Sequence, residues 1–304
     1  MNTSAVFLMT GPSSPITKRL YITYHQHMEK ALNDKDLQLV GAVLQNDYAA
    51  AESLLYMGAN PNCSDKDGRT LLIIAIQNDA LKLVQLLVSS GCNPNLADAD
   101  GSTALMFAVS RGNAGIIQSL IASGAEQKFH HHADKNPLMM AVQWGKADAV
   151  SHLLNFRADT ETRDKQGKTA LILAAEKGRD DIVRTLIEHG ADVSKADNDG
   201  WTALMYAVIG KYKNIIKFLR DAGAAINNKR LPGTIREMFH DAIRDGDIDT
   251  VRLMLSAGIS PEQITRYGLY ALTVADMCQN REMINILIES GADRKNLIHS
   301  ASVD

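Results

Sequence analysis

The sequence predicts an all-α solenoid of stacked helix-turn-helix units with short β-hairpin fingers. Three observations lead to this fold class, and all three are combs of residues with the same period of 33. The first comb consists of glycines, and the spacing of 33 resumes at Gly258 after a two-residue insertion. Its members are Gly58, Gly91, Gly124, Gly190, Gly223, Gly258 and Gly291. Fixed-period self-similarity is the signature of repeat architectures.

The other two combs are apolar and keep the same spacing. One runs through the first half of each unit, at Leu72, Leu105, Leu138, Leu171, Leu204, Phe239 and Leu272. The other runs through the second half, at Val84, Ile117, Val150, Val183, Ile216, Val251 and Ile284. Three sets of residues that keep the same spacing over the same part of the chain cannot result from composition alone. The two apolar sets predict two helices in each unit, each with one apolar face.

One unit, "DGSTALMFAVSRGNAGIIQSLIASGA" (100–125), shows how its residues build the elements in order. Asp100 and Gly101 supply a tight turn, and Thr103 is placed to N-cap a first helix beginning at the next residue. Gly112 ends that helix, and an apolar stripe then predicts a second helix. A closing glycine takes the left-handed position. One helix pair cannot cover its own apolar face, so the units must stack.

Three motifs carry a resemblance to a known family: "DADGSTAL" (98–105), "DKQGKTAL" (164–171) and "GADV" (190–193). They resemble the ankyrin-repeat family, and the resemblance covers roughly residues 37–296. It implies this fold and a role in binding other proteins. Ankyrin units usually carry T-P-L-H, but here the proline slot holds proline only at Pro137. The histidine slot is apolar at Ile73, Met106, Met139, Ile172 and Met205. We therefore expect apolar packing to replace the inter-repeat hydrogen bond that the family makes from this histidine.

The chain divides into three parts by this register. Residues 1–36 do not repeat, and an i+4 apolar stripe after Ser14-Pro15 predicts an amphipathic helix. We expect it to cap the first unit; the alternative is a helix that binds a partner or dimerises. Residues 37–296 form about eight units, the last two divergent, and residues 297–304 form a polar tail.

The divergent units contain two candidate capping boxes, "TIRE" (234–237) and "SPEQ" (260–263). They predict helices that start early in place of the finger turns. The fingers should then extend only from about residue 60 to residue 230. A further irregularity is Arg157, which stands where the equivalent residues are glycine. Either it has drifted in a tolerant solenoid or it is retained for a contact.

Composition excludes several function classes. The formal net charge is −3, which gives no global attraction to nucleic acid or to an anionic membrane. Three cysteines without a C-x-x-C pair indicate a reducing compartment rather than a disulfide framework or a zinc site. We find neither a signal peptide nor a membrane span, so we expect a cytoplasmic monomer.

No catalytic or cofactor motif is present, so we predict that the chain is not an enzyme and needs no cofactor. Asp65, Asp98, Asp164 and Asp197 share one repeat position, which turn formation explains better than acid–base chemistry. In "FHHHAD" (129–134), His130 and His132 could face the same way, and Asp98 or Asp164 on a neighbouring finger could add a third ligand. A zinc site normally uses three or four ligands and no cysteine is near, so we expect solvated or partner-contacting histidines, with a metal site as the alternative. We predict no metal. Cys278 lacks a base beside it and is expected to be a plain thiol.

A partner is expected on the concave face, which the finger turns and the ends of the first helices form in such stacks. Both tryptophans of the protein lie in these slots, beside more cations than anions. The predicted contacts are Arg69, Arg111, His132, Lys135, Trp144, Lys168, Lys177 and Trp201. A weakly basic face with aromatic anchors suits an acidic, partly apolar protein surface. The alternative is that each tryptophan packs sideways on the next repeat.

The leading hypothesis is therefore a non-enzymatic protein–protein interaction scaffold. A second is a secreted effector of an intracellular bacterium, translocated into the host cytosol, because the Thr-Ala-Leu-Met motif and the polar tail are similar to such proteins. A third is a regulatory subunit of an enzyme complex. Nucleic acid is not expected as a partner.

Overall fold

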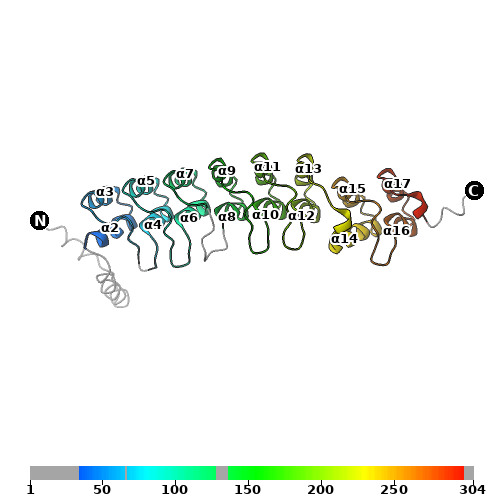
Figure 1. Cartoon of the computed structure of the whole chain (residues 1–304), viewed down its shortest axis with the longest axis horizontal. Helices are drawn as coiled ribbons and strands as arrows, with labels where there is room; N and C mark the ends of the chain where they lie inside the picture. The colour runs from blue at the N-terminus through cyan, green and yellow to red at the C-terminus, as the bar shows by residue number, and fades with distance from the viewer. Residues whose placement is uncertain (1–33, 66, 128–135, 298–304) are drawn as a thin grey trace, which may run out of the picture. The chain divides into compact units, whose positions relative to one another are not determined.

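The computed structural model describes residues 34–65, 67–127 and 136–297, which form two compact units, 1–137 and 138–304. Within each unit the described chain alternates a first helix, a tight turn and a second helix (Figure 1). The first helices lie in one row and the second helices in another, so each unit has two helical layers (Figure 1). The amphipathic helix expected after Ser14-Pro15 lies outside the described residues.

The first unit contains three helix pairs among its described residues. They are α2 (Asp34–Leu44) with α3 (Tyr48–Tyr56), α4 (Leu71–Gln77) with α5 (Leu81–Ser89), and α6 (Ala104–Arg111) with α7 (Ala114–Ala122). The first helix among the described residues, α2, begins three residues before Leu37, where the repeat region was expected to start.

The second unit continues the pattern. Its first-layer helices are α8 (Pro137–Gln143), α10 (Ala170–Glu176), α12 (Ala203–Ile209), α14 (Gly233–Arg244) and α16 (Ala271–Met277). Its second-layer helices are α9 (Ala147–Asn155), α11 (Asp180–Glu188), α13 (Lys213–Asp221), α15 (Ile248–Ser256) and α17 (Arg281–Glu289). Two short 3₁₀ turns, η2 (Asn228–Arg230) and η3 (Arg294–Asn296), occupy the loops that follow α13 and α17.

Threonines start the short first helices. The hydroxyl of Thr70 accepts a hydrogen bond from the backbone N–H of Ile73 at 3.2 Å, and Thr169 and Thr202 act in the same way. α6 begins at Ala104 as expected, with Thr103 as its N-cap residue, although the Thr103 hydroxyl makes no capping bond. Capping oxygens satisfy backbone donors that the first turn of a helix leaves unpaired.

The apolar combs form the cores of the two units, as expected. Leu72, Leu105, Leu138, Leu171 and Leu204 are at most 1% exposed. The residues in the family's histidine slot are also buried, from Ile73 at 0% to Met139 at 5%. The predicted replacement of a hydrogen bond by apolar packing is thus confirmed at these slots. Burying one such side chain stabilises a fold by about 1.5–3 kcal/mol.

Polar side chains also connect neighbouring repeats, which the sequence analysis did not anticipate. In each case a side-chain oxygen near the end of one repeat accepts a hydrogen bond from a backbone N–H of the next, as Asn62 does from Asn93. The distances are 2.6–2.9 Å. The acceptors are Asn62 and Asn95 in the first unit and Glu161, Asn228 and Glu262 in the second.

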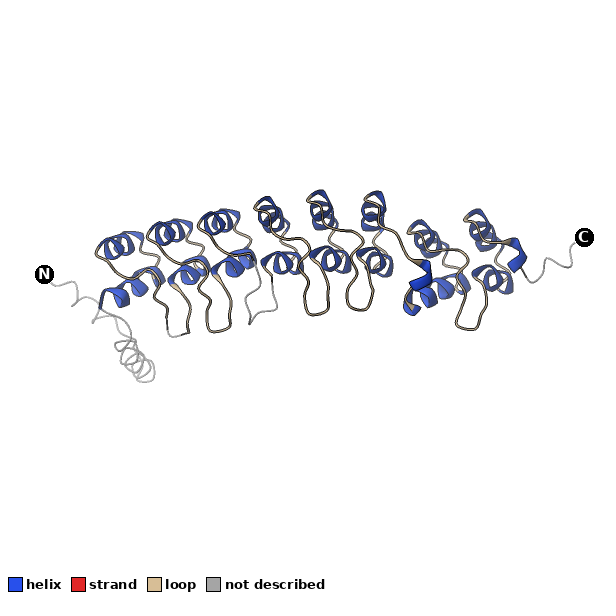
Figure 2. Cartoon of the chain, viewed as in Figure 1, coloured by secondary structure: helices blue, strands red, loops and turns tan. Residues whose placement is uncertain are grey.

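The two divergent repeats differ from their predicted form. α14 starts early, as expected, and is longer than the other first helices. It begins at Gly233 with Pro232 as N-cap, so "TIRE" lies inside the helix and is not a capping box. "SPEQ" starts no helix either. A finger follows it instead, with an isolated bridge between Ile264 and Tyr270 (Figure 2). The expectation that fingers stop near residue 230 is therefore wrong.

The finger persists because Thr265 takes the place of the usual aspartate. Its hydroxyl accepts from the backbone N–H groups of Tyr267 at 3.2 Å and Leu269 at 3.0 Å. Gly268 adopts φ 78°, the left-handed conformation that this turn requires. A hydroxyl can hold such a turn as a carboxylate does, so a search for Asp-Gly pairs overlooks it.

Arg157 adopts the left-handed conformation that its glycine equivalents adopt, with φ 60°. Its backbone N–H donates to the carbonyl of Leu154 at 2.8 Å, and its side chain is exposed. A side chain in this region of φ and ψ costs about 1 kcal/mol.

We therefore expect Arg157→Gly to raise the free energy of unfolding by about 0.5–1 kcal/mol, because it removes a Cβ from a left-handed residue. Urea denaturation followed by circular dichroism measures the change. A variant less stable than wild type would mean that the Arg157 side chain makes a contact stronger than its strain.

Candidate functional site

The finger turns are held by aspartates at one repeat position. Asp197 Oδ1 accepts from the backbone N–H groups of Asp199 at 3.0 Å and Trp201 at 2.8 Å. Asp65, Asp98 and Asp164 make the same pair of bonds. The prediction that these carboxylates form turns rather than a catalytic site is confirmed, and the turns fix the residues that follow them.

In the first unit, the two predicted contact arginines meet at one residue. Arg69 binds Asp65 through Nε at 2.8 Å and donates from Nη1 to the Gln77 side chain at 3.1 Å. Arg111 donates from Nη2 to the Gln77 backbone carbonyl at 2.8 Å and remains exposed. The charge of Arg69 is therefore neutralised within its own repeat, whereas Arg111 contacts a neutral group.

In the second unit, Lys168 lies between an acid and an aromatic ring. Its Nζ is 2.8 Å from Glu176 Oε2 and 4.7 Å from the centre of the Tyr206 ring. The Lys168 side chain is only 13% exposed. Burial acts to lower the pKa of Lys168, but Glu176 and Tyr206 outweigh it, so the pKa is raised. Lys168 thus belongs to a packed cluster and offers little surface to a partner.

Trp201 and Tyr206 complete this cluster. Their ring centres lie 5.3 Å apart at 44°, a common geometry for aromatic pairs. The Tyr206 hydroxyl donates to Asp197 Oδ2 at 2.7 Å. Burial, together with the hydrogen bond to Asp197, raises the pKa of Tyr206 to about 12. Trp201 is half-buried against this ring, so it has an intramolecular packing role.

Trp144 and Lys177 differ from that cluster because both are exposed. Trp144 follows the last residue of α8, and its side chain is 41% exposed. Lys177 is the C-cap of α10 and holds the equivalent position one repeat later. Ile209, at the end of α12, is 37% exposed. The ends of consecutive first helices therefore present apolar and cationic side chains to solvent.

The structure groups the predicted contacts only in part. In the first unit, Gln77 connects Arg69 with Arg111. In the second unit, Tyr206 connects Lys168 with Trp201, whereas Trp144 and Lys177 are exposed at helix ends. His132 and Lys135, and with them the pair His130 and His132, lie outside the described residues. Within the described ranges no group of three His, Cys, Asp or Glu side chains could hold a metal ion.

Tyr206, Glu176 and Asp197 were not predicted as members of one cluster. A signal for Tyr206 did exist. "TALMFAV" (103–109) and "TALMYAV" (202–208) differ only by Phe107 and Tyr206, and the added hydroxyl is the group that reaches Asp197. The pairing of Lys168 with Glu176 could not be predicted in the same way, because it joins a finger to the end of a helix.

The cysteines form no disulfide, and two of them are shielded. Burial, with a smaller effect of the Asp36 carboxylate, raises the pKa of the Cys63 thiol to about 12. Burial raises the pKa of the Cys92 thiol to about 11. Thiols with raised pKa values are poor nucleophiles, and the exposed Cys278 is the C-cap of α16.

Three copies of a family model described as ankyrin repeats match residues 39–131, 114–197 and 138–230, together more than half of the chain. The chain belongs to the ankyrin-repeat family. This ankyrin-repeat chain is 30% identical to the protein of the solved structure titled EF0377, an ankyrin repeat protein. The TM-score is 0.56, and the alignment covers 60% of this chain and 96% of that one. The ankyrin repeat domain of Bcl-3 gives a TM-score of 0.52 at 24% identity, over 83% of this chain and 97% of that one, and this shows the fold alone.

Curated relatives match only locally. Short transient receptor potential channel 4 from mouse, rat and human is 39% identical over 64 residues, which is 19% of this ankyrin-repeat chain and 7% of the channel. A ferret protein with ankyrin repeat, SAM and basic leucine zipper domains is 38% identical over 63 residues, 21% of this chain and 13% of that protein. No described helix is long and apolar enough to cross a bilayer.

Proposed function

We propose that this ankyrin-repeat chain is a non-enzymatic scaffold that binds a partner protein on the face formed by its finger turns and first-helix ends. Ankyrin repeats are protein–protein interaction modules, and the family match supports this class of function. The observation that carries the choice of face is the exposure of Trp144 at the end of α8. A large aromatic residue left in solvent is typical of a binding hot spot.

The charges of the described residues narrow the partner chemistry. Lys168 is paired with Glu176 inside a cluster, and Arg69 is paired with Asp65, so neither contributes much positive potential. Arg111 and Lys177 are exposed, and Arg111 donates to a neutral backbone carbonyl. We therefore propose a partner surface that is partly apolar and carries carboxylates opposite these cations.

Rigid presentation is the mechanism that this face supports. The aspartates hold the finger turns, and the buried apolar residues of the combs hold the first helices in place. Few parts of this face therefore need to become ordered when a partner binds. A surface that is already ordered loses less entropy on association and binds more tightly for the same contacts.

The location and the two alternative roles also remain proposals. Free cysteines agree with a reducing compartment, and we propose the cytoplasm. A bacterial effector role requires that the tail direct translocation of a reporter into a host cell. A regulatory-subunit role requires a catalytic chain that co-purifies stoichiometrically. No feature of the described residues favours either role over the scaffold.

The proposal is tested with Trp144→Ala. We expect affinity capture from the native cell to recover a partner with wild type, and the variant to bind that partner at least tenfold more weakly, about 1.4 kcal/mol. Phe156→Ala is the matched control, since Phe156 lies in the same repeat at the end of α9 and is 36% exposed. Isothermal titration with the purified partner gives both affinities. Equal binding by wild type and Trp144→Ala would contradict the proposed face.

A further inference from the structure

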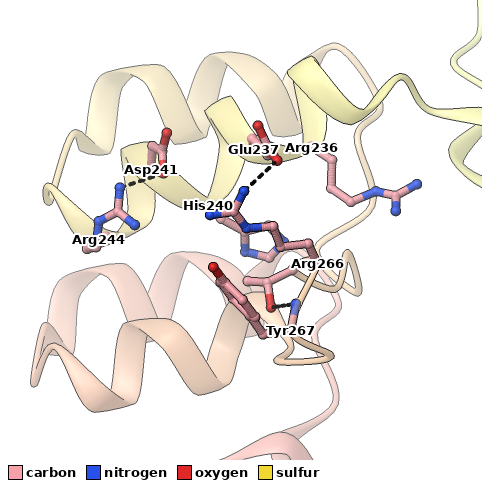
Figure 3. Close-up of a pocket in the computed structure, with 8 residues that line it drawn as sticks. Arg236, Glu237, His240, Asp241, Arg244, Arg266 and Tyr267 are labelled. Atoms are coloured by element: carbon pink, nitrogen blue, oxygen red, sulfur yellow. Dashed lines mark hydrogen bonds and ion pairs between the residues drawn. The ribbon is translucent and has the colours of Figure 1, made fainter.

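A pocket of about 310 Å³ lies in the second unit between α14 and the finger at residues 264–270. In Figure 3, Arg266 of the finger lies beside His240 of α14 and is joined to Glu237, whereas the Arg236 side chain extends away from them. This finger is the one that Thr265 holds, in the repeat where the sequence predicted none. The pocket lies on the same kind of surface as the proposed face, a finger beside a first helix, but the two divergent repeats form it and Trp144 does not line it.

Arginines dominate the charge of this pocket. Arg236, Arg244 and Arg266 line it together with the carboxylates of Glu237 and Asp241, which leaves one net positive charge. Arg244 pairs with Asp241 at 2.5 Å, and Arg266 lies 3.8 Å from Glu237. The side chains of Arg244 and Arg266 are 61% and 69% exposed, so both guanidinium groups can rearrange toward a ligand.

Buried polar atoms at the pocket lack partners. His240 is 5% exposed, and both ring nitrogens are buried without a well-formed hydrogen bond among the described residues, although the backbone carbonyl of Ile264 lies close to the ring. The Nε of Arg236 is likewise buried and unpaired there. Burial lowers the pKa of His240, although the backbone carbonyl of Ile264 opposes the shift. These atoms are too deeply buried to be reached from the pocket without a rearrangement, so the donors that a ligand meets first are the exposed guanidinium groups of Arg244 and Arg266.

The rim of the pocket is apolar and exposed. Tyr267 lines it and is 74% exposed, with the Arg266 guanidinium 4.8 Å from its ring centre. The same finger exposes Ile264 by 42% and Tyr270 by 39%. A finger that presents three apolar side chains beside an arginine pocket combines the two elements of a peptide-binding site, an anchor for charge and a surface for apolar contact.

We propose that this pocket binds a carboxylate side chain from an acidic segment of a partner protein, with an adjacent apolar residue of that segment packed on Tyr267. The single net positive charge matches one carboxylate better than a doubly charged phosphate. The proposal rests on the proposed protein-binding function and assigns a carboxylate to one part of the surface that fingers and first helices form. Trp144 does not line this pocket, so variants at Trp144 and variants at the pocket test the two proposals separately.

Differential selection from a phage library of random 12-residue peptides tests the pocket on the full chain. The baits are wild type, Arg244→Glu/Arg266→Glu and the control Arg252→Glu, which alters an exposed arginine on α15 that does not line the pocket. In the double variant one arginine faces four carboxylates. We expect peptides that bind wild type and the control but not the double variant, and these should carry Asp or Glu beside an apolar residue.

Fluorescence anisotropy with the selected peptides then measures the effect. We expect at least tenfold weaker binding by the double variant, by Tyr267→Ala, and by peptides whose acids are replaced with Asn or Gln. Circular dichroism melting checks that the variants are folded. The pocket proposal is overturned if no acid-bearing peptide separates wild type from the double variant, or if the amide peptides bind equally well. Selection on Trp144→Ala tests the Trp144 contact separately: peptides that depend on Trp144 support the proposed function even if the pocket variants bind normally.

Discussion

Replacing Lys168 by glutamate is expected to lower the free energy of unfolding by about 3 kcal/mol. The change breaks the 2.8 Å pair with Glu176, removes the cation from the Tyr206 ring, and places two carboxylates side by side. Removing one partner of a buried pair costs about 3–5 kcal/mol, and the 31% exposure of Glu176 places this pair at the lower end. Urea denaturation of wild type and variant measures the loss.

Lys177→Glu is the matched control for this change. It introduces the same charge reversal at the C-cap of α10, where the side chain is exposed, so we expect a change within about 0.5 kcal/mol. The exchange Lys168→Glu/Glu176→Lys should recover at least half of the lost stability, because it restores the ion pair. If Lys168→Glu is as stable as Lys177→Glu, Lys168 is accessible and belongs with the proposed partner contacts.

Trp201→Ala is expected to lower the free energy of unfolding by about 2 kcal/mol, whereas Trp144→Ala should change it by less than about 0.5 kcal/mol. Trp201 is half-buried and its ring centre lies 5.3 Å from that of Tyr206, so its removal leaves the Tyr206 ring without this aromatic neighbour. Trp144 is 41% exposed at a helix end. Thermal and urea unfolding of the two single variants measure the difference.

This expectation revises the sequence analysis, which treated the two tryptophans as equivalent contacts. Tyr206→Phe serves as a companion variant, because it keeps the ring and removes only the hydroxyl that donates to Asp197. Its expected cost is about 1 kcal/mol, the usual contribution of one hydrogen bond. Equal losses for Trp144→Ala and Trp201→Ala would show that the Tyr206 cluster does not support Trp201.

The sequence alone determined the repeat and most of its elements. A 33-residue period requires the same local conformation at the equivalent position of each repeat. Thr103 therefore predicted a helix that begins at Ala104, and α6 begins there. The glycine comb predicted left-handed residues, and even Arg157 adopts that conformation. These features follow from short-range physics, namely turn chemistry, capping and apolar periodicity, which a single repeat already encodes.

Tertiary structure decided which polar side chains are available to a ligand. Lys168 and Lys177 look alike in sequence, but only Lys168 meets Glu176 and Tyr206, the latter from the next repeat. The pocket at α14 needs His240 and Arg266, which lie 26 positions apart and come together only because one finger packs against the preceding helix. Register places a residue on a face, but burial and charge pairing depend on the neighbouring repeat, whose side chains at equivalent positions differ from one repeat to the next.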